Sequence, residues 1–171
     1  MLELKSRERR NIENEGVGMH TQDTIRTLNR LIQTCRDGEE FCRAAGESVD
    51  SVGLRPLFNF RREEWGRQGD ELQALVLLLG GDPATFGTAG AQLLRGWVKL
   101  KALVFGRSDL SVLSLWQASQ QRALERYEEA LSGYLPQRIR RTVGLQADRV
   151  MDRAEQIATL CDRYSVHSQG A

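Results

Sequence analysis

The chain has 171 residues, which suffices for one domain with its own core and is short for two. Its 24 Lys and Arg residues nearly balance its 23 Asp and Glu residues, so the net charge of +1 gives no general attraction to nucleic acid or to an anionic membrane. No apolar run approaches the ~18 residues that a membrane-spanning helix needs. We therefore expect neither nucleic acid nor a membrane among its partners.

The cysteines and the N-terminal residues indicate a compartment. Cys35 and Cys42 fall on one face of a predicted helix, about 10 Å apart along its axis at 1.5 Å per residue, which is too far for a disulfide. The first ten residues are mostly charged and lack the apolar core of a signal peptide. We therefore expect the protein in the reducing cytoplasm.

The N-terminal part of the chain divides into a tail and a long helix. Residues 1–20 are charged and have no hydrophobic period, so we expect a flexible tail. A first helix is predicted over about 22–48, where apolar residues recur at steps of three and four. Its apolar stripe includes Glu39, where an apolar residue would be expected. Gly38 and Gly46 within it indicate close packing against a neighbouring helix.

A second helix is predicted from about residue 51 to Leu79. Ser51 is the candidate for its N-cap. At its middle the periodicity leaves two possibilities open, because either Glu64 or Trp65 could face the core. The sequence Gly80-Gly81-Asp82-Pro83 then ends the helix, with Gly for a left-handed cap and Pro to prevent continuation.

Three more helices are predicted in the rest of the chain, over about 89–105, 109–133 and 137–164. The apolar stripe of the second of these contains Gln120, and that of the third contains Gln146. Together with Glu39, these residues would place polar groups from three helices in the core.

The connections between the four long helices predict a topology. The first and second helices, like the third and fourth, are joined by short links, and each pair therefore forms an antiparallel hairpin. A long connection with its own short helix separates the two hairpins. We predict an all-α, ferritin-like four-helix bundle of two antiparallel hairpins with a long crossover. The domain would span 21–165, and residues 166–171 would fray.

The polar residues of this bundle are candidate metal ligands. In the predicted topology Glu39, Glu64 and Gln120 come to nearly the same level, and Gln146 lies about two turns away. Helices that aim carboxylates at a shared core build the di-iron and di-manganese sites of bundle proteins. A metal centre in this chain would use these four residues and would hold iron or manganese.

The ligand set for such a centre is incomplete. Di-metal bundles use a Glu from each of two helices and a Glu-x-x-His motif from each of the other two. The only histidines, His20 and His167, fall outside the predicted helices. We therefore predict no metal and no other cofactor. Instead, we expect a polar layer in which Glu39 is mostly buried and accepts a hydrogen bond from Gln120 or Arg61.

A series of short motifs supports the same fold. In order, the chain contains Leu28-Asn29-Arg30-Leu31-Ile32, Asp37-Gly38-Glu39-Glu40-Phe41, Glu71-Leu72-Gln73, Leu79-Gly80-Gly81-Asp82-Pro83, Arg95-Gly96-Trp97, Leu100-Lys101, Tyr127-Glu128-Glu129-Ala130-Leu131 and Leu135-Pro136. Over about residues 22–164 it resembles a bacterial family of small ferritin-like four-helix-bundle proteins of unknown function, typified by Pseudomonas members.

The resemblance extends to only part of the polar core. The family has Glu at the position of Glu39 and Gln at that of Gln146, and both are present here. It has Gly-Glu-Asp where this chain has Ser119-Gln120-Gln121, and His where this chain has Ala154 and Leu94. The resemblance thus implies a fold and a loose association with ferritin-like proteins, some of which are linked to stress responses, without an established reaction.

These observations lead to one main hypothesis and one alternative. We expect a non-enzymatic, cytoplasmic, ferritin-like bundle with a polar, His-free core and a structural or partner-binding role. Its partner would be an unidentified protein or a second copy of the chain. The alternative is a metal-dependent redox or iron-handling protein that uses the carboxylate and amide groups of the core.

Overall fold

A computed structural model of the chain describes residues 2–84 and 108–168. All regular structure in these two ranges is helical, which confirms the predicted all-α class. The helices are α1 (Leu2–Ser48), α2 (Leu54–Leu78), α4 (Asp109–Ser132) and α5 (Gln137–Ser168). In the described part of the chain, no helix combines the length and the apolarity needed to cross a membrane.

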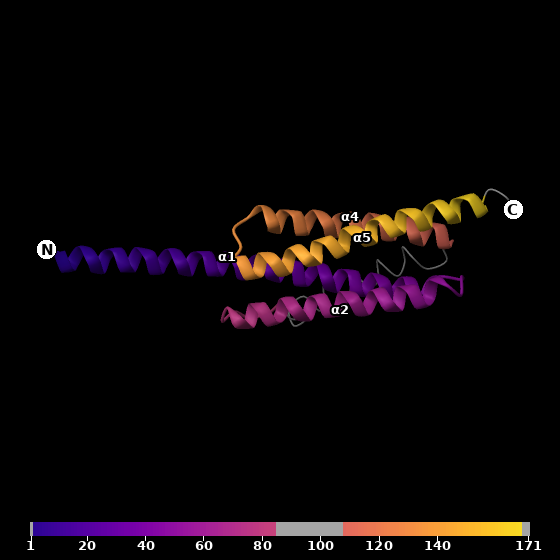
Figure 1. Cartoon of the computed structure of the whole chain (residues 1–171). Helices are drawn as coiled ribbons and strands as arrows, with labels where there is room; N and C mark the ends of the chain where they lie inside the picture. Colours follow the sequence, from indigo (N-terminus) through magenta and orange to yellow (C-terminus); the bar gives the residue numbers. More distant parts are fainter. Residues whose placement is uncertain (1, 85–107, 169–171) are drawn as a thin grey trace.

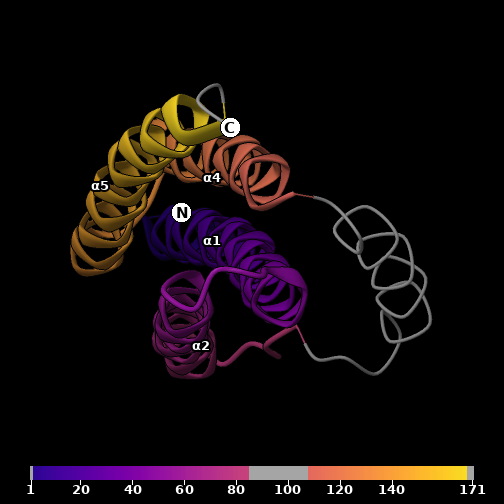
Figure 2. The same ribbon diagram turned by 90° about the vertical axis from the view of Figure 1, so that its right-hand side faces the viewer.

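The helices pack as two hairpins. Figure 1 shows α1 and α2 running in opposite directions, as do α4 and α5, whereas α2 and α4 are parallel. The end-on view in Figure 2 places α1 beside both α2 and α4. The predicted bundle of two antiparallel hairpins joined by a crossover is therefore confirmed. The short helix predicted over 89–105 lies outside the described residues.

The N-terminal boundary differs from the expectation. A tail was expected over 1–20, but α1 is helical from Leu2 and extends beyond the ends of the other helices in Figure 1. The sequence before residue 22 is rich in Leu, Glu, Lys and Arg, which favour helix without requiring an apolar stripe. The lack of a hydrophobic period in residues 1–20 therefore did not mean that the first helix begins only at residue 22. At the other terminus, α5 continues to Ser168 and so includes His167.

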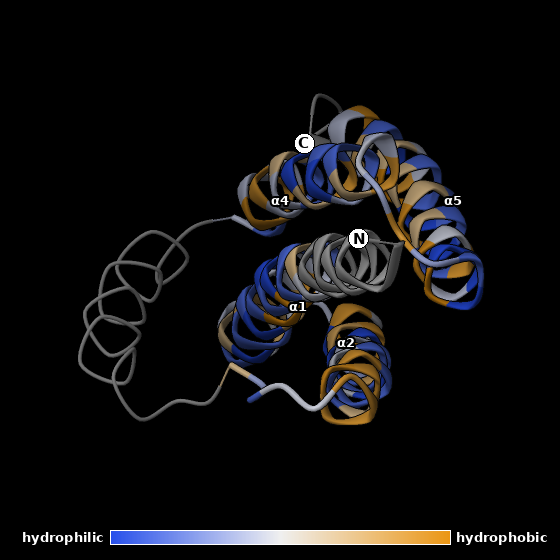
Figure 3. Cartoon of the chain, turned by 90° about the vertical axis from the view of Figure 1, so that its left-hand side faces the viewer, coloured by the Kyte–Doolittle hydropathy of each residue, from blue (hydrophilic) through white to orange (hydrophobic). Residues whose placement is uncertain are grey.

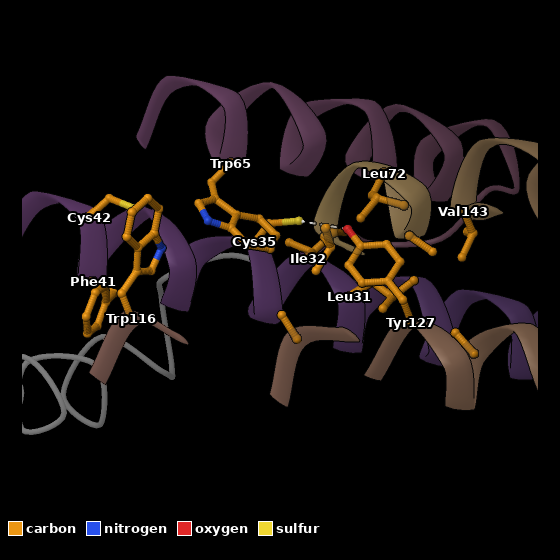
Figure 4. Packing of buried hydrophobic residues seen from close by; sticks show 14 of the residues in the cluster. Leu31, Ile32, Cys35, Phe41, Cys42, Trp65, Leu72, Trp116, Tyr127 and Val143 are labelled. Carbon is orange, nitrogen blue, oxygen red and sulfur yellow. Dashed lines mark hydrogen bonds between the residues drawn. The ribbon is translucent and has the colours of Figure 1, made fainter. Parts of the chain in front are cut away.

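The core lies along the shared axis of the four helices, and α1 contributes most to it. Its buried residues include Leu28, Ile32 and Cys35, which recur at helical spacing as predicted. On α2 the open choice is resolved, because Trp65 is 1% exposed and faces the core. Figure 4 shows its indole ring among the buried side chains of α1 and α4.

The turns are held by specific backbone and side-chain contacts. Gly80 has a φ of 75°, the left-handed conformation that was predicted for the end of α2. Ser108 caps α4 by accepting a hydrogen bond from the Ser111 backbone N–H. The Asp109 carboxylate accepts hydrogen bonds of 2.9 Å and 3.0 Å from the backbone N–H groups of Asp50 and Ser51, so it ties the α1–α2 turn to the start of α4. Ser51 itself does not cap α2, whose N-cap is Gly53.

Candidate functional site

The centre of the bundle contains a buried arginine. Arg153 of α5 is 3% exposed, and its Nε lies 3.5 Å from Oε2 of Glu64 on α2. Its Nη1 donates a hydrogen bond of 3.2 Å to Oε1 of Gln68, and its guanidinium lies 5.0 Å from the centroid of the Trp65 ring. A buried charge is costly without such partners. Burial lowers the pKa of Arg153, while the Glu64 carboxylate acts in the opposite direction.

The Glu64 carboxylate is shared by two guanidinium groups. Arg61 Nη1, one turn earlier on α2, lies 2.6 Å from the same Oε2 atom that faces Arg153. Arg61 also donates a hydrogen bond to Gln156 Oε1, so it links α2 to α5 a second time. Glu64 is therefore the shared counter-ion of Arg61 and Arg153, and its ion pair with Arg153 links the α1–α2 hairpin to the α4–α5 hairpin.

A second polar layer lies about two turns away. Tyr127 of α4 is fully buried and donates a hydrogen bond of 2.9 Å to Oε1 of Gln146. Nε2 of Gln146 donates in turn to Oε2 of Glu71 at 2.8 Å and to the Gln68 carbonyl at 3.3 Å. The Cys35 sulfur lies 3.4 Å from the Tyr127 hydroxyl, the contact drawn as a dashed line in Figure 4. This layer joins all four helices.

The buried thiols are poorly suited to chemistry. Burial is the largest influence on both, and it raises the pKa of Cys35 and of Cys42 to about 12. Burial also raises the pKa of Tyr127 above its usual value. These groups are therefore neutral at physiological pH, and a neutral buried thiol is a poor nucleophile and a poor metal ligand.

The four candidate ligands do not form one cluster. Glu39 is 26% exposed and accepts a hydrogen bond of 2.8 Å from Arg36 on its own helix, so the predicted hydrogen bond from Gln120 or Arg61 is wrong. The physical reason is the Trp65 ring, which packs against Gly38. This contact turns Gly38, and not Glu39, toward the core on the buried face of α1. Gln120 is fully buried, but neither of its amide atoms has a hydrogen-bond partner in the described residues.

The donor set at the core fits a di-metal centre poorly. Among the described residues, no three His, Cys, Asp or Glu side chains lie close enough to hold a metal ion together. Glu64 is already paired with Arg61 and Arg153, whose positive charges would oppose a bound cation. His20 is exposed, with its ring 4.8 Å from that of Tyr134.

Sequence reasoning missed the residues that organise the core. Arg153 lies three residues after Val150 and four before Ile157, and both of these are buried, so its spacing alone indicated an inward position. Because charged residues usually lie on the surface, Arg153 was not among the predicted core residues. Tyr127 appears in one of the sequence motifs, but nothing local in the sequence indicated its contacts with Gln146 and Cys35.

The fold is also found in a solved structure. The chain superposes with a TM-score of 0.71 on a two-domain protein from Anabaena variabilis ATCC 29413 that contains DJ-1/ThiJ/PfpI-like and ferritin-like domains. The two share 16% sequence identity, and the match covers 84% of this chain and 40% of that one. At this identity the likeness shows the fold alone, which is that of a ferritin-like four-helix bundle. A search of curated proteins gave no significant match.

The sequence also matches a known family over more than half of its length. Residues 23–133 match the family described as "Domain of unknown function (DUF2383)". The matched region runs from the part of α1 that enters the bundle to the end of α4, and it includes Glu39, Glu64 and Gln120. The chain belongs to this family of unknown function.

Proposed function

We propose that this protein is a non-enzymatic bundle that acts by contact with another protein chain. The observation that carries the proposal is Arg153, a guanidinium that is 3% exposed at the centre of the core. In this account its contacts with Glu64, Gln68 and Trp65 fix how the two hairpins pack, which is an attested use of buried polar groups. The core then has a structural role, and function lies on the surface.

The alternative is a redox or iron-handling protein with iron or manganese at Glu39, Glu64, Gln120 and Gln146. The contacts that these four residues make argue against a metal centre. Glu39 pairs with Arg36 near the surface, and Glu64 and Gln146 are occupied by Arg153 and Tyr127. A metal would have to displace these partners and overcome the charge of Arg153.

Metal analysis separates the two hypotheses. Protein purified without chelators from cells supplied with iron and manganese should contain far less than one ion of iron, manganese or zinc per chain. Metal near one ion per chain, abolished by Glu64→Ala or Glu39→Ala and retained by the exposed control Glu63→Ala, would overturn the proposal.

The surface that supports a binding role is an apolar end of the bundle, formed by the exposed side chains of Met19, Leu77, Leu78 and Tyr134. The end of α2, the α4–α5 turn and the neighbouring part of α1 lie together at this end in Figures 1 and 3. The ring contact of His20 with Tyr134 joins α1 to that turn. Exposed apolar side chains at one end of a bundle are candidates for a contact with another protein.

The partner that we propose is a second copy of the chain. At the apolar end α1 continues as a helix past the rest of the bundle (Figure 1). The other helices of the chain do not accompany this extension, so a second copy is the neighbour that would lie beside it. In a two-fold dimer, the commonest oligomer, the exposed apolar side chains at this end of each copy would be covered by the other copy.

Sedimentation equilibrium of the full chain tests this partner. The expected mass is twice the 19.3 kDa of one chain at micromolar concentration. The double variant Leu77→Glu/Leu78→Glu should be monomeric, whereas Leu145→Glu, which changes an exposed leucine of α5, should remain a dimer. A monomeric wild-type protein at all concentrations would contradict self-association.

The compartment that we propose is the cytoplasm. The support is chemical, because Cys35, Cys42 and Cys161 are all free thiols. Free cysteines persist in a reducing environment. Fractionation of the native cells with an antibody against the chain would test this, and recovery with secreted proteins would contradict it.

A further inference from the structure

Six buried polar atoms in the core are left without hydrogen-bond partners in the described residues. They are Arg61 Nε, Trp65 Nε1, Gln68 Nε2, Trp116 Nε1, Gln120 Nε2 and Gln120 Oε1. Five of the six are N–H donors, and only the Gln120 carbonyl oxygen is an acceptor. Native cores leave few polar groups unpaired, so such a group requires an explanation.

The register of the helices places Gln120 of α4 and Arg153 of α5 at one level. Tyr127 of α4 bonds to Gln146 of the antiparallel α5. Gln120 lies two turns before Tyr127, and Arg153 lies two turns after Gln146, so Gln120 and Arg153 share a level. Arg153 in turn contacts Trp65 and its neighbours on α2. Gln120 and the unpartnered α2 groups around Arg153 therefore lie close to one level, and Trp116, which packs against Phe58, lies one turn farther along α4.

The two indole groups face the same part of that layer. Trp65 and Trp116 are each 1% exposed, and Figure 4 shows their ring nitrogens pointing toward one another. Trp116 lies one turn before Gln120, on the same face of α4. Two indole N–H groups and an amide thus converge from two helices.

Inside the layer, two guanidinium groups, those of Arg61 and Arg153, share the single carboxylate of Glu64. At its edge Arg36 pairs with two carboxylates, Glu39 at 2.8 Å and the exposed Asp70 at 3.6 Å. The excess of one positive charge is therefore confined to the buried part of the layer. A site with many donors, one acceptor and positive charge is complementary to a ligand that only accepts hydrogen bonds. Water fits less well, because it brings two donors of its own.

We propose that this layer binds one small monovalent anion of halide size, chloride in the cell. The N–H groups of Trp65, Trp116 and Gln120 donate hydrogen bonds to it, and Arg153 supplies the compensating charge. The anion completes the polar core and locks the two hairpins together. Because it exchanges only when the core opens, its binding raises the stability of the folded chain. This site is independent of the proposed surface contact.

Bromide is the direct probe, because its anomalous scattering distinguishes it from water. Crystals of the full chain grown with sodium bromide should show one interior anomalous peak, within hydrogen-bond distance of both indole nitrogens. In solution, the thermal midpoint should rise with bromide when sodium gluconate keeps the ionic strength constant. Interior density without an anomalous signal, or a midpoint insensitive to bromide, would overturn the proposal.

A matched pair of variants assigns the effect to this layer. Gln120→Glu places a carboxylate where the anion would sit, so both the bromide peak and the bromide dependence should disappear. Gln121→Glu makes the same change at the exposed neighbour and should preserve both. If Gln120→Glu does not fold, Trp116→Phe removes one donor with little change of shape and should shift the bromide dependence to higher concentration. Unchanged dependence in Trp116→Phe would contradict the site.

Discussion

The indole ring of Trp65 lies so close to the backbone of Gly38 that a Cβ atom at residue 38 would be 2.5 Å from Cε2 of the ring. This contact sets the rotation of α1 about its axis. It turns Gly38 toward α2 and leaves the next residue, Glu39, at the edge of the core. The same tryptophan ring contacts the Arg153 guanidinium.

We predict that Gly38→Ala destabilises the protein. The methyl group would overlap the Trp65 ring, and overpacking of a core costs about 1–3 kcal/mol, more than the ~1 kcal/mol that Ala gains over Gly in a helix. The matched control is Gly144→Ala in α5, where the described residues place nothing within 4 Å of the added Cβ. Urea unfolding should show the control to be neutral or stabilising. Equal effects of the two changes would contradict the packing.

Tyr127→Phe should be destabilising through its hydrogen bonds. The change leaves Gln146 Oε1 without its donor in the buried layer, at a cost of about 1–3 kcal/mol. Tyr134→Phe removes a hydroxyl from a tyrosine that is 63% exposed, so it should change the unfolding free energy little. Similar urea midpoints for the two variants would show that the hydrogen bonds of the Tyr127 hydroxyl do not contribute to the free energy of unfolding.

The clamp at Asp109 predicts a dependence on pH. Partial burial acts to raise the pKa of its carboxyl, but the hydrogen bonds from the Ser51 side chain and from the N–H groups of Asp50 and Ser51 prevail and lower it from 3.8. A lowered pKa means that the carboxylate stabilises the fold above the unfolded value of about 3.9, and that this contribution is lost as the pH falls through the folded pKa.

Asp109→Asn should therefore be less stable than the wild type at neutral pH, and the difference should shrink as the pH falls below about 4. Urea unfolding from pH 7 down to about pH 3 measures it. Asp152→Asn on the exposed face of α5 serves as the control. A stability difference that stays constant across this range would show that the Asp109 charge does not hold the turn.

The three thiols should react in two classes. Cys35 and Cys42 are buried, with pKa values raised to about 12, whereas Cys161 is partly exposed. Ellman's reagent at mildly alkaline pH should label one thiol per native chain quickly and the other two only after unfolding. Cys161→Ser should abolish the fast phase. Rapid labelling of all three thiols in the native protein would contradict the packed core.

The sequence was sufficient for the topology because helix pairing follows from connection lengths and from hydrophobic period, both of which are local. Which side chains of each helix face the core was harder to predict from the sequence. One residue corresponds to about 100° around a helix, so taking Glu39 in place of Gly38 as the inward position misplaced a charge by a quarter turn. The correct choice depended on Trp65, a residue of another helix.

The polar network was beyond local reasoning for a related reason. An arginine such as Arg153 is assigned to the surface unless its partners are known. Those partners, Glu64 and Gln68, come from α2 and are far away in the sequence. Only the packing of the two hairpins brings them together.

The coupling between Arg153 and Glu64 is the most direct test of the central claim, that an ion pair and not a ligand set organises the core. Urea unfolding of Arg153→Met, Glu64→Leu and the double variant gives their interaction energy. We predict that Glu64→Leu is strongly destabilising, because it leaves both guanidinium groups without a carboxylate, and that Arg153→Met is less so, because Arg61 still pairs with Glu64. The double variant should be much less unstable than the sum of the two, by about 1–3 kcal/mol.

A parallel cycle with the exposed Arg62→Met in place of Arg153→Met should show additive effects. If the effects of Arg153→Met and Glu64→Leu also simply add, the two residues are not energetically coupled, and the claim that their ion pair organises the core is wrong.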